Sequence, residues 1–333
     1  MTSKVPIYTL NNGVEIPGLG ENEYQIYKPN FVLTLNANEQ DWVAGPGLLK
    51  SKTHQDKHDH DKNGYKHMDT AYGYGTEPYV GKAIRAVGIP REDIFVTTKL
   101  PNHHHDRVAE SLDISLTRAG FDYYDLPIQT YLSQYLVHWP QAWPFKGEDN
   151  ESRLPDGSHE VVEHPNINET WEQMEKLLET DKVRAIGVSN FSVKNLKQLL
   201  TTAKIVPAVN QVEMHPHQNQ KELKEFCDSK GILLTAYSPT GYQHVATDHV
   251  VVEIAKKHNA SSAQVVLAWH LARGTSAVPK STSSKHQIEN LNPPTLDAED
   301  IDKLNSLHKN VHYCDYGEPR NKVFGWTYEQ MGW

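Results

Sequence analysis

The chain has 333 residues, a formal net charge of −9 and a sequence pI of about 6.1. It has no long basic tract, which argues against nucleic acid or an anionic membrane as a partner. The N-terminus lacks the apolar run of a signal peptide, no segment resembles a membrane span, and two cysteines suit a reducing compartment. We therefore expect a cytoplasmic protein.

The first predicted element is a hairpin in YTLNNGVEIP, because Asn-Gly is typical of a tight turn between two strands. Residues 16–20 form the first candidate strand of a larger sheet. From residue 65 onward, apolar or β-branched runs alternate with amphipathic segments of helical period. The seven runs are residues 67–71, 94–99, 135–139, 185–190, 208–212, 233–238 and 276–281. The helical segments include residues 170–179, 193–200 and 248–258, and Gly88, Gly120 and Gly231 follow three helices.

Eight strands alternating with helices predict an α/β fold, a parallel (β/α)8 TIM barrel that occupies residues 1–333 as a single domain. An open doubly wound sheet fits less well, because no glycine-rich phosphate loop is present. Carboxyl ends of barrel strands meet at one face, where enzymes of this fold place their active sites. The predicted strand ends there are Asp69, Lys99, His138, Ser189 with Asn190, Gln211, Tyr237 with Ser238, and Lys280 with Ser281.

Tyr74 follows Asp69 by five positions, between two glycines in a flexible turn. A phenol is a poor proton donor at neutral pH, but a nearby Lys99 ammonium would lower its pKa, and Asp69 would hold the lysine charged. His138 could orient a carbonyl oxygen by a hydrogen bond. Together these residues would protonate an oxygen while a cofactor delivers a hydride to the adjacent carbon. Alone, Tyr74 would be interpreted as an exposed turn aromatic.

The segments DTAYGYGTE, TTKL, YLVHWP, GVSNF, NQVEMHP, AYSP and VPKS occur in this order. In combination they resemble the aldo-keto reductase family, over residues 5–20 and 64–310. The resemblance implies an NADP(H)-binding barrel without a Rossmann domain. It also implies an enzyme that reduces small aldehydes or ketones, or oxidises the corresponding alcohols or polyols. The tail VFGWTYEQMGW is similar to that of fungal glycerol dehydrogenases or small-aldehyde reductases.

The resemblance assigns roles residue by residue. Tyr74 would be the proton donor, with Asp69, Lys99 and His138 completing the catalytic set, and Trp139 would join His138 at the substrate. The implied cofactor residues are Ser189, Asn190 and Gln211 for the nicotinamide amide, Tyr237 for its ring, and Ser238, Lys280, Ser281, Glu289 and Asn290 for the phosphates and adenosine. His286 stands where the family usually has arginine, so we expect NADPH to be preferred over NADH by a reduced margin.

Two stretches depart from the family pattern. Residues 21–63 replace the Gly-Thr-Trp segment and first helix, and they show no sustained helical period, so we expect them to be largely irregular. Residues 127–134 are inserted before YLVHWP. We interpret both as translated intron or mis-joined exon, with isoform-specific loops as the alternative. We expect the tail, residues 311–333, to lie over the active-site face. The disrupted first unit also permits a second function, an impaired cofactor-binding barrel with a redox-sensing or interaction role.

Two histidine-rich stretches raise the question of a metal site. They are residues 54–62 and the run His103, His104 and His105. Such runs bind zinc or nickel adventitiously, but they lack the fixed scaffold that a specific site needs. We therefore expect no functional metal site.

Overall fold

The structure is a computed structural model that describes residues 5–22, 64–87, 90–121, 132–148, 152–281, 283–314 and 321–333. The irregular stretch predicted for residues 21–63 lies outside the described residues from position 23 onward, as do Gly88 and residues 127–131 of the predicted insert. The last three insert residues, 132–134, belong to a barrel strand. The predicted strand of residues 135–139 is therefore wrong in its bounds, because Leu132 and Gln134 pair with Val183 and Ala185.

The predicted N-terminal hairpin is present. Strands β1 (Ile7–Thr9) and β2 (Glu15–Pro17) pair antiparallel, and Gly13 adopts a φ of 83° in the turn. The buried side chain of Ile16 packs in a cluster with residues of the barrel strands, among them Phe95 and Val209. The hairpin therefore covers one end of the barrel.

The strand predicted at residues 16–20 is wrong in its bounds. Residues 16 and 17 pair within the hairpin, and the first barrel strand is β3 (Glu21–Asn22). Hydrogen bonding decides this, because Glu21 and Asn22 pair with Met68 and Asp69 of the next strand.

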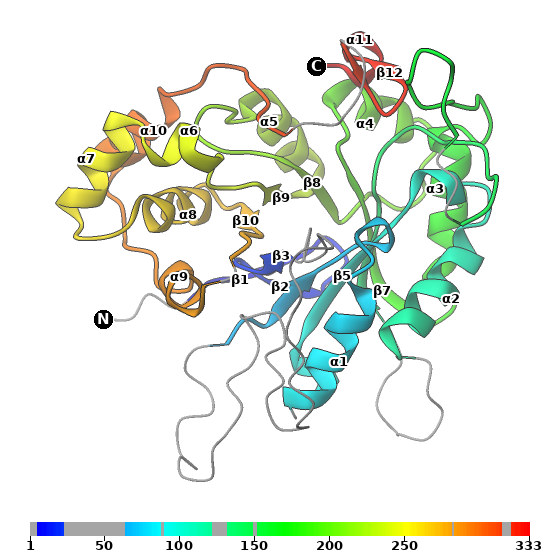
Figure 1. Ribbon diagram of the computed structural model, residues 1–333, viewed down its shortest axis with the longest axis horizontal. Helices are drawn as coiled ribbons and strands as arrows, with labels where there is room; N and C mark the ends of the chain where they lie inside the picture. The colour runs from blue at the N-terminus through cyan, green and yellow to red at the C-terminus, as the bar shows by residue number, and fades with distance from the viewer. Residues whose placement is uncertain are drawn as a thin grey trace.

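Eight parallel strands form the main sheet in the described part of the chain, and their spatial order follows their order in sequence (Figure 1). The strands after β3 are β4 (His67–Asp69), β5 (Phe95–Leu100), β6 (Leu132–Val137), β7 (Val183–Ser189), β8 (Val209–Glu213), β9 (Leu233–Tyr237) and β10 (Ser276–Ala277). A parallel bridge joins Leu19 to Ala277, and the backbone N–H of Asn22 donates to the carbonyl of Pro279 over 3.1 Å. This seam closes the sheet, so the predicted (β/α)8 barrel is confirmed.

Most of the helices surround the sheet on its outer side, whereas the last one packs against the two short strands of the tail (Figure 1). They are α1 (Glu77–Val87), α2 (Val108–Ala119), α3 (Ile167–Leu177), α4 (Val193–Leu199), α5 (Lys221–Lys230), α6 (Tyr242–Ala246), α7 (His249–Lys257), α8 (Ser262–Ala272), α9 (Ser284–Asn290), α10 (Ala298–Asn305) and α11 (Tyr328–Met331). The three predicted helices correspond to α3, α4 and α7, and left-handed Gly120 and Gly231 end α2 and α5 as predicted. Short strands β11 (Lys322–Val323) and β12 (Trp326–Thr327) precede α11.

Helices α1 and α2 approach each other closely at Gly81. A Cβ atom at this position would lie 1.7 Å from the backbone oxygen of Ala119. We expect Gly81→Ala to lower the free energy of unfolding by about 1–3 kcal/mol, because the two helices must separate to accept the methyl group. Urea unfolding would measure this. Gly64→Ala is the control, since no atom of the described part of the chain lies within 4 Å of the added Cβ there. Equal stability of the two variants would contradict the close approach.

Candidate active site

The carboxyl ends of the strands bring most of the predicted polar residues to one face of the barrel. Asp69 ends β4 and Lys99 is the penultimate residue of β5. Ser189 and Tyr237 end β7 and β9. Because parallel strands of a barrel share their direction, these side chains reach the same end of the sheet.

An ion pair lies inside the barrel at this end. The Nζ atom of Lys99 is 2.7 Å from Oδ1 of Asp69, and both side chains are fully buried. Nζ also donates to the carbonyl of Thr70 over 2.9 Å. Burial lowers the pKa of Lys99, and the Asp69 carboxylate opposes that change. The pair fixes an ammonium group at the base of the site.

Two amides hold the Asp69 carboxylate from other strands. Asn22 Nδ2 donates to Oδ1 and Gln211 Nε2 donates to Oδ2, each over 2.7 Å. The resemblance placed Gln211 at a nicotinamide amide, whereas its side-chain nitrogen here binds Asp69. Sequence reasoning missed Asn22, because it lies in the stretch that departs from the family pattern and carries no motif.

Tyr74 lies beside this ion pair, on the 3-10 helix η1 (Tyr72–Tyr74). Gly75 ends η1 with a φ of 67°, a backbone conformation that favours glycine. The Tyr74 hydroxyl is 3.4 Å from Nε2 of His138, and Lys99 Nζ lies 4.9 Å from the Tyr74 ring centroid. A phenol, an imidazole and an ammonium therefore converge, with Tyr74 partly exposed to solvent.

His138 follows β6 directly and its side chain is surrounded by protein. Burial brings its pKa well below the ordinary value, and the nearby Lys99 charge lowers it further. The imidazole is therefore neutral at pH 7. A neutral ring has one N–H donor and one acceptor nitrogen, so it can share a hydrogen bond with a phenol and with a carbonyl oxygen.

A second polar group joins β7 to β9. Tyr237 donates its hydroxyl hydrogen to Asn190 Oδ1 over 2.8 Å, and Asn190 Nδ2 donates to Ser189 Oγ over 3.1 Å. Asn190 Nδ2 also donates to the backbone carbonyl of His138 over 3.0 Å. Asn190 adopts a φ of 64° to make these contacts. The hydrogen bond to the His138 carbonyl therefore places this group next to Tyr74 and His138.

The remaining predicted cofactor residues follow β10. This strand ends at Ala277, so the predicted strand of residues 276–281 is too long. Lys280 and Ser281 lie in the next loop, and His286, Glu289 and Asn290 lie on α9. The side chains of Lys280 and His286 are exposed, whereas Asn290 is buried.

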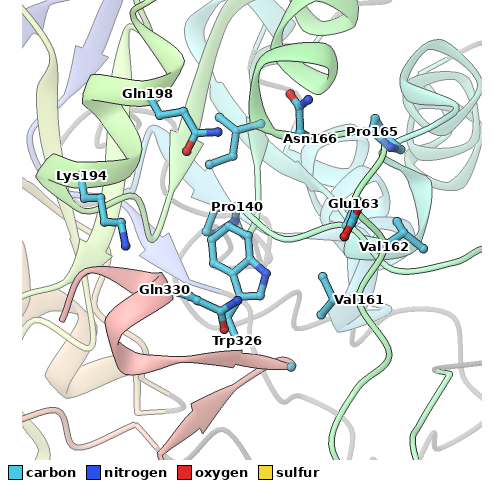
Figure 2. Close-up of a pocket in the computed structure, with 13 residues that line it drawn as sticks. Pro140, Val161, Val162, Glu163, Pro165, Asn166, Lys194, Gln198, Trp326 and Gln330 are labelled. Carbon is cyan, nitrogen blue, oxygen red and sulfur yellow. The ribbon is translucent and has the colours of Figure 1, made fainter.

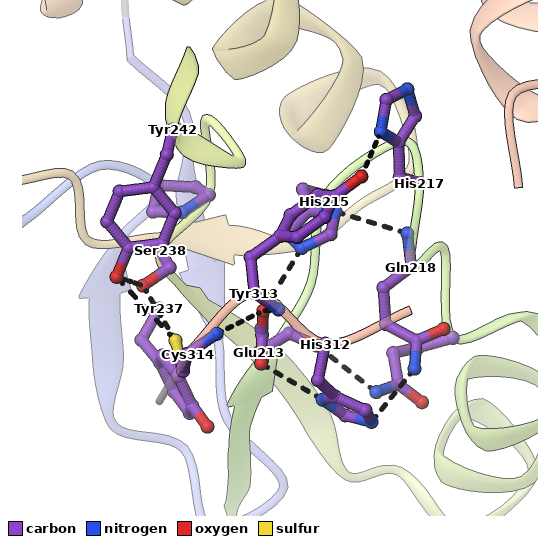
Figure 3. Close-up of polar contacts among 12 residues, drawn as sticks. Glu213, His215, His217, Gln218, Tyr237, Ser238, Tyr242, His312, Tyr313 and Cys314 are labelled. Carbon is purple, nitrogen blue, oxygen red and sulfur yellow. Dashed lines mark hydrogen bonds and ion pairs between the residues drawn. The ribbon is translucent and has the colours of Figure 1, made fainter. Parts of the chain in front are cut away.

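Glu213, at the end of β8, anchors the chain segment that follows α10 (Figure 3). Its Oε1 accepts the backbone N–H of Tyr313 over 2.6 Å, and its Oε2 lies 2.9 Å from Nδ1 of His312. Burial alone would raise the pKa of Glu213, but hydrogen bonds from His215 and His312 outweigh it and hold the pKa well below its usual range. Ser238 lies at the same anchor, 3.3 Å from Cys314 Sγ. Sequence reasoning did not assign a role to Glu213, although NQVEMHP contains it.

Trp139 contacts the end of the tail. Its ring centroid is 4.8 Å from that of Phe324 and 6.3 Å from that of Trp333. A cavity of about 500 Å³ lies between this part of the tail, α4 and the loop before α3, where Trp326 projects between Lys194 and Val161 (Figure 2). Tyr74, Lys99 and His138 do not line this cavity, so it is separate from the site around Asp69.

Residues 51–309 match the aldo/keto reductase family. The chain belongs to this family. The predicted resemblance is thus confirmed. This aldo/keto reductase is 42% identical to the glycerol 2-dehydrogenase (NADP(+)) of Saccharomyces cerevisiae, over 91% of each chain. It is 39% identical to the D-galacturonate reductase of Hypocrea jecorina, over 95% of this chain and 94% of the relative. The aldose reductase structure from Schistosoma japonicum superposes with a TM-score of 0.77 at 30% identity, covering 93% of this chain and 94% of that one.

Among the described residues of this aldo/keto reductase, no helix has both the length and the apolar character to cross a membrane.

Proposed function

We propose that this aldo/keto reductase is an NADP(H)-dependent oxidoreductase that reduces small aldehydes or ketones, or oxidises the corresponding alcohols or polyols. The buried ion pair of Asp69 and Lys99, with Tyr74 and His138 beside it, carries the proposal. The names of the yeast and Hypocrea jecorina relatives, an NADP(+)-linked glycerol dehydrogenase and a galacturonate reductase, support a small polar substrate.

The residues present fit a nicotinamide cofactor. Ser189 and Asn190 offer a hydroxyl and an amide that match a carboxamide, and the partly exposed ring of Tyr237 adjoins them. Lys280 and His286 offer exposed nitrogen groups suited to a phosphate. When bound, the cofactor supplies a hydride to the carbonyl carbon.

Tyr74 is the proposed proton donor. In reduction, its hydroxyl proton passes to the carbonyl oxygen, and the Lys99 ammonium stabilises the phenolate that remains. Asp69 keeps Lys99 charged and positioned through their 2.7 Å contact. The neutral His138 ring donates a hydrogen bond to the same carbonyl oxygen and orients it. In alcohol oxidation, the Tyr74 phenolate takes the proton back.

The test is NADPH consumption with glyceraldehyde as substrate, with cofactor binding followed separately by tryptophan fluorescence. Turnover together with binding supports the reductase. Binding of NADPH without turnover on a panel of aldehydes would instead favour the second hypothesis, an impaired cofactor-binding barrel.

The residues proposed to bind the phosphate of the cofactor give a separate prediction. A planar guanidinium can pair with two phosphate oxygens, whereas the His286 imidazole cannot. We expect His286→Arg to raise the ratio of kcat/KM for NADPH over NADH by about tenfold. His249→Arg adds the same charge at an exposed position on α7 and should leave the ratio unchanged. If both variants leave it unchanged, His286 does not face the 2′-phosphate.

A further inference from the structure

The histidine run at residues 103–105 is buried, although the sequence suggested a run without a scaffold. His103 and His104 lie on the 3-10 helix η3 (Asn102–His104), with 8% and 0% of their surface exposed. Tyr72 and Phe145 both pack against the His104 ring, with centroids 4.9 and 5.6 Å away. For this run the expected lack of a fixed scaffold does not hold, because the side chains are buried and packed.

We propose that His103, His104 and Glu148 bind a divalent transition metal ion, with Zn²⁺ as the best match. One ligand atom from each residue lies within 4.8 Å of the other two. His104 Nε2 is 3.4 Å from Glu148 Oε2. In a tetrahedral zinc site with bonds of about 2.0–2.1 Å, neighbouring ligand atoms lie about 3.4 Å apart. Two imidazoles and one carboxylate leave a fourth position for water.

The surroundings of His104 fix how its ring faces Glu148. His104 Nδ1 lies 3.0 Å from Ser111 Oγ, on α2, and Ser111 Oγ accepts a hydrogen bond from Tyr135 over 3.0 Å. Ser111 Oγ has a second lone pair that can accept Nδ1–H. In this tautomer Nε2 keeps its lone pair, and Nε2 makes no hydrogen bond to any of the described residues. This is how metal-binding histidines are commonly oriented by a second partner.

Charged side chains of both signs lie around the proposed site. Arg107 and Arg118 oppose a bound cation. Asp106 pairs with Arg107 over 2.9 Å, and Glu148 adds a negative charge at the ligand position.

Metal binding would connect two loops of the catalytic face. η3 follows β5, and Glu148 lies in the loop that follows β6. Tyr72, on the same short helix as Tyr74, packs against both histidine rings in T-shaped contacts. The site therefore fastens the exposed Glu148 to a buried scaffold next to η1. It is independent of the proposed reductase activity.

The test is titration of the full chain with Zn²⁺ in competition with a colorimetric chelator. His54, His58 and His60 would first be replaced by glutamine, to remove adventitious binding at that run. We expect this parent to bind about one Zn²⁺, and Glu148→Gln to weaken binding about 100-fold. His104→Asn removes Nε2 and should do the same. Co²⁺ in place of Zn²⁺ should show the visible absorption of a four-coordinate site.

His164→Gln is the control, because this exposed histidine pairs with Glu169 away from the site. It should bind Zn²⁺ as the parent does. Thermal unfolding without metal checks that each variant is folded. If His104→Asn does not fold, Glu148→Gln alone tests the proposal, since Glu148 is exposed. No zinc binding by the parent, or equal binding by the parent and Glu148→Gln, would overturn the proposal.

Discussion

Tyr74→Phe is expected to lower kcat by about 10²–10⁴-fold while the affinity for NADPH stays nearly unchanged. The substitution removes the hydroxyl that lies 3.4 Å from His138 Nε2 and keeps the ring that Lys99 contacts. The decrease in kcat should therefore come from slower proton transfer alone. Initial rates of NADPH consumption with glyceraldehyde measure kcat, and fluorescence titration measures cofactor affinity.

Tyr79→Phe is the matched control, because Tyr79 is 40% exposed on α1 and is not one of the residues around Asp69. It should keep kcat near that of the unchanged enzyme. Near-normal turnover in the Tyr74→Phe protein would exclude Tyr74 as the proton donor.

Lys99→Met is expected to lower the free energy of unfolding by about 3–5 kcal/mol, in addition to abolishing most of the activity. The reason is that the Asp69 carboxylate would stay fully buried without its cation. Asn22 and Gln211 would still donate hydrogen bonds to it, but neither carries a charge. Urea unfolding followed by circular dichroism measures the change.

The double variant Asp69→Asn/Lys99→Met separates lost charge pairing from lost packing. It removes both charges, so we expect it to be more stable than Lys99→Met alone. A double variant as unstable as Lys99→Met would mean that the packing of the lysine side chain, and not the unpaired carboxylate, sets the loss.

The sequence was sufficient to predict most of the strands that carry the site. Runs such as FVTTKL and VRAIGVS consist mostly of apolar and β-branched residues, because strands of a closed barrel are largely buried on both faces. Their polar ends predicted that Asp69, Lys99 and His138 would meet. The amphipathic period predicted α3, α4 and α7 within three residues at each end.

Features that depend on long-range pairing could not be predicted in the same way. Strand β3 is only two residues, Glu21 and Asn22, and it exists because of its partners in β4 and the contact with Pro279. The hydrogen bond from Asn22 to Asp69 follows from that pairing. The burial of His103 and His104 could not be predicted from the sequence either, since a run of histidines has no apolar period.

The seam between the first and last strands also has a consequence for the order of folding. Ser281 donates its backbone N–H to Glu21 across this seam, and the two residues are 260 positions apart in the chain. Closing so long a loop has a large entropy cost, and contacts of such high sequence separation form slowly. The residues of β4 to β9 are synthesised before residue 277, so we expect an open sheet to precede the closed one. Its exposed edges are where the nascent protein is most open to association with other chains.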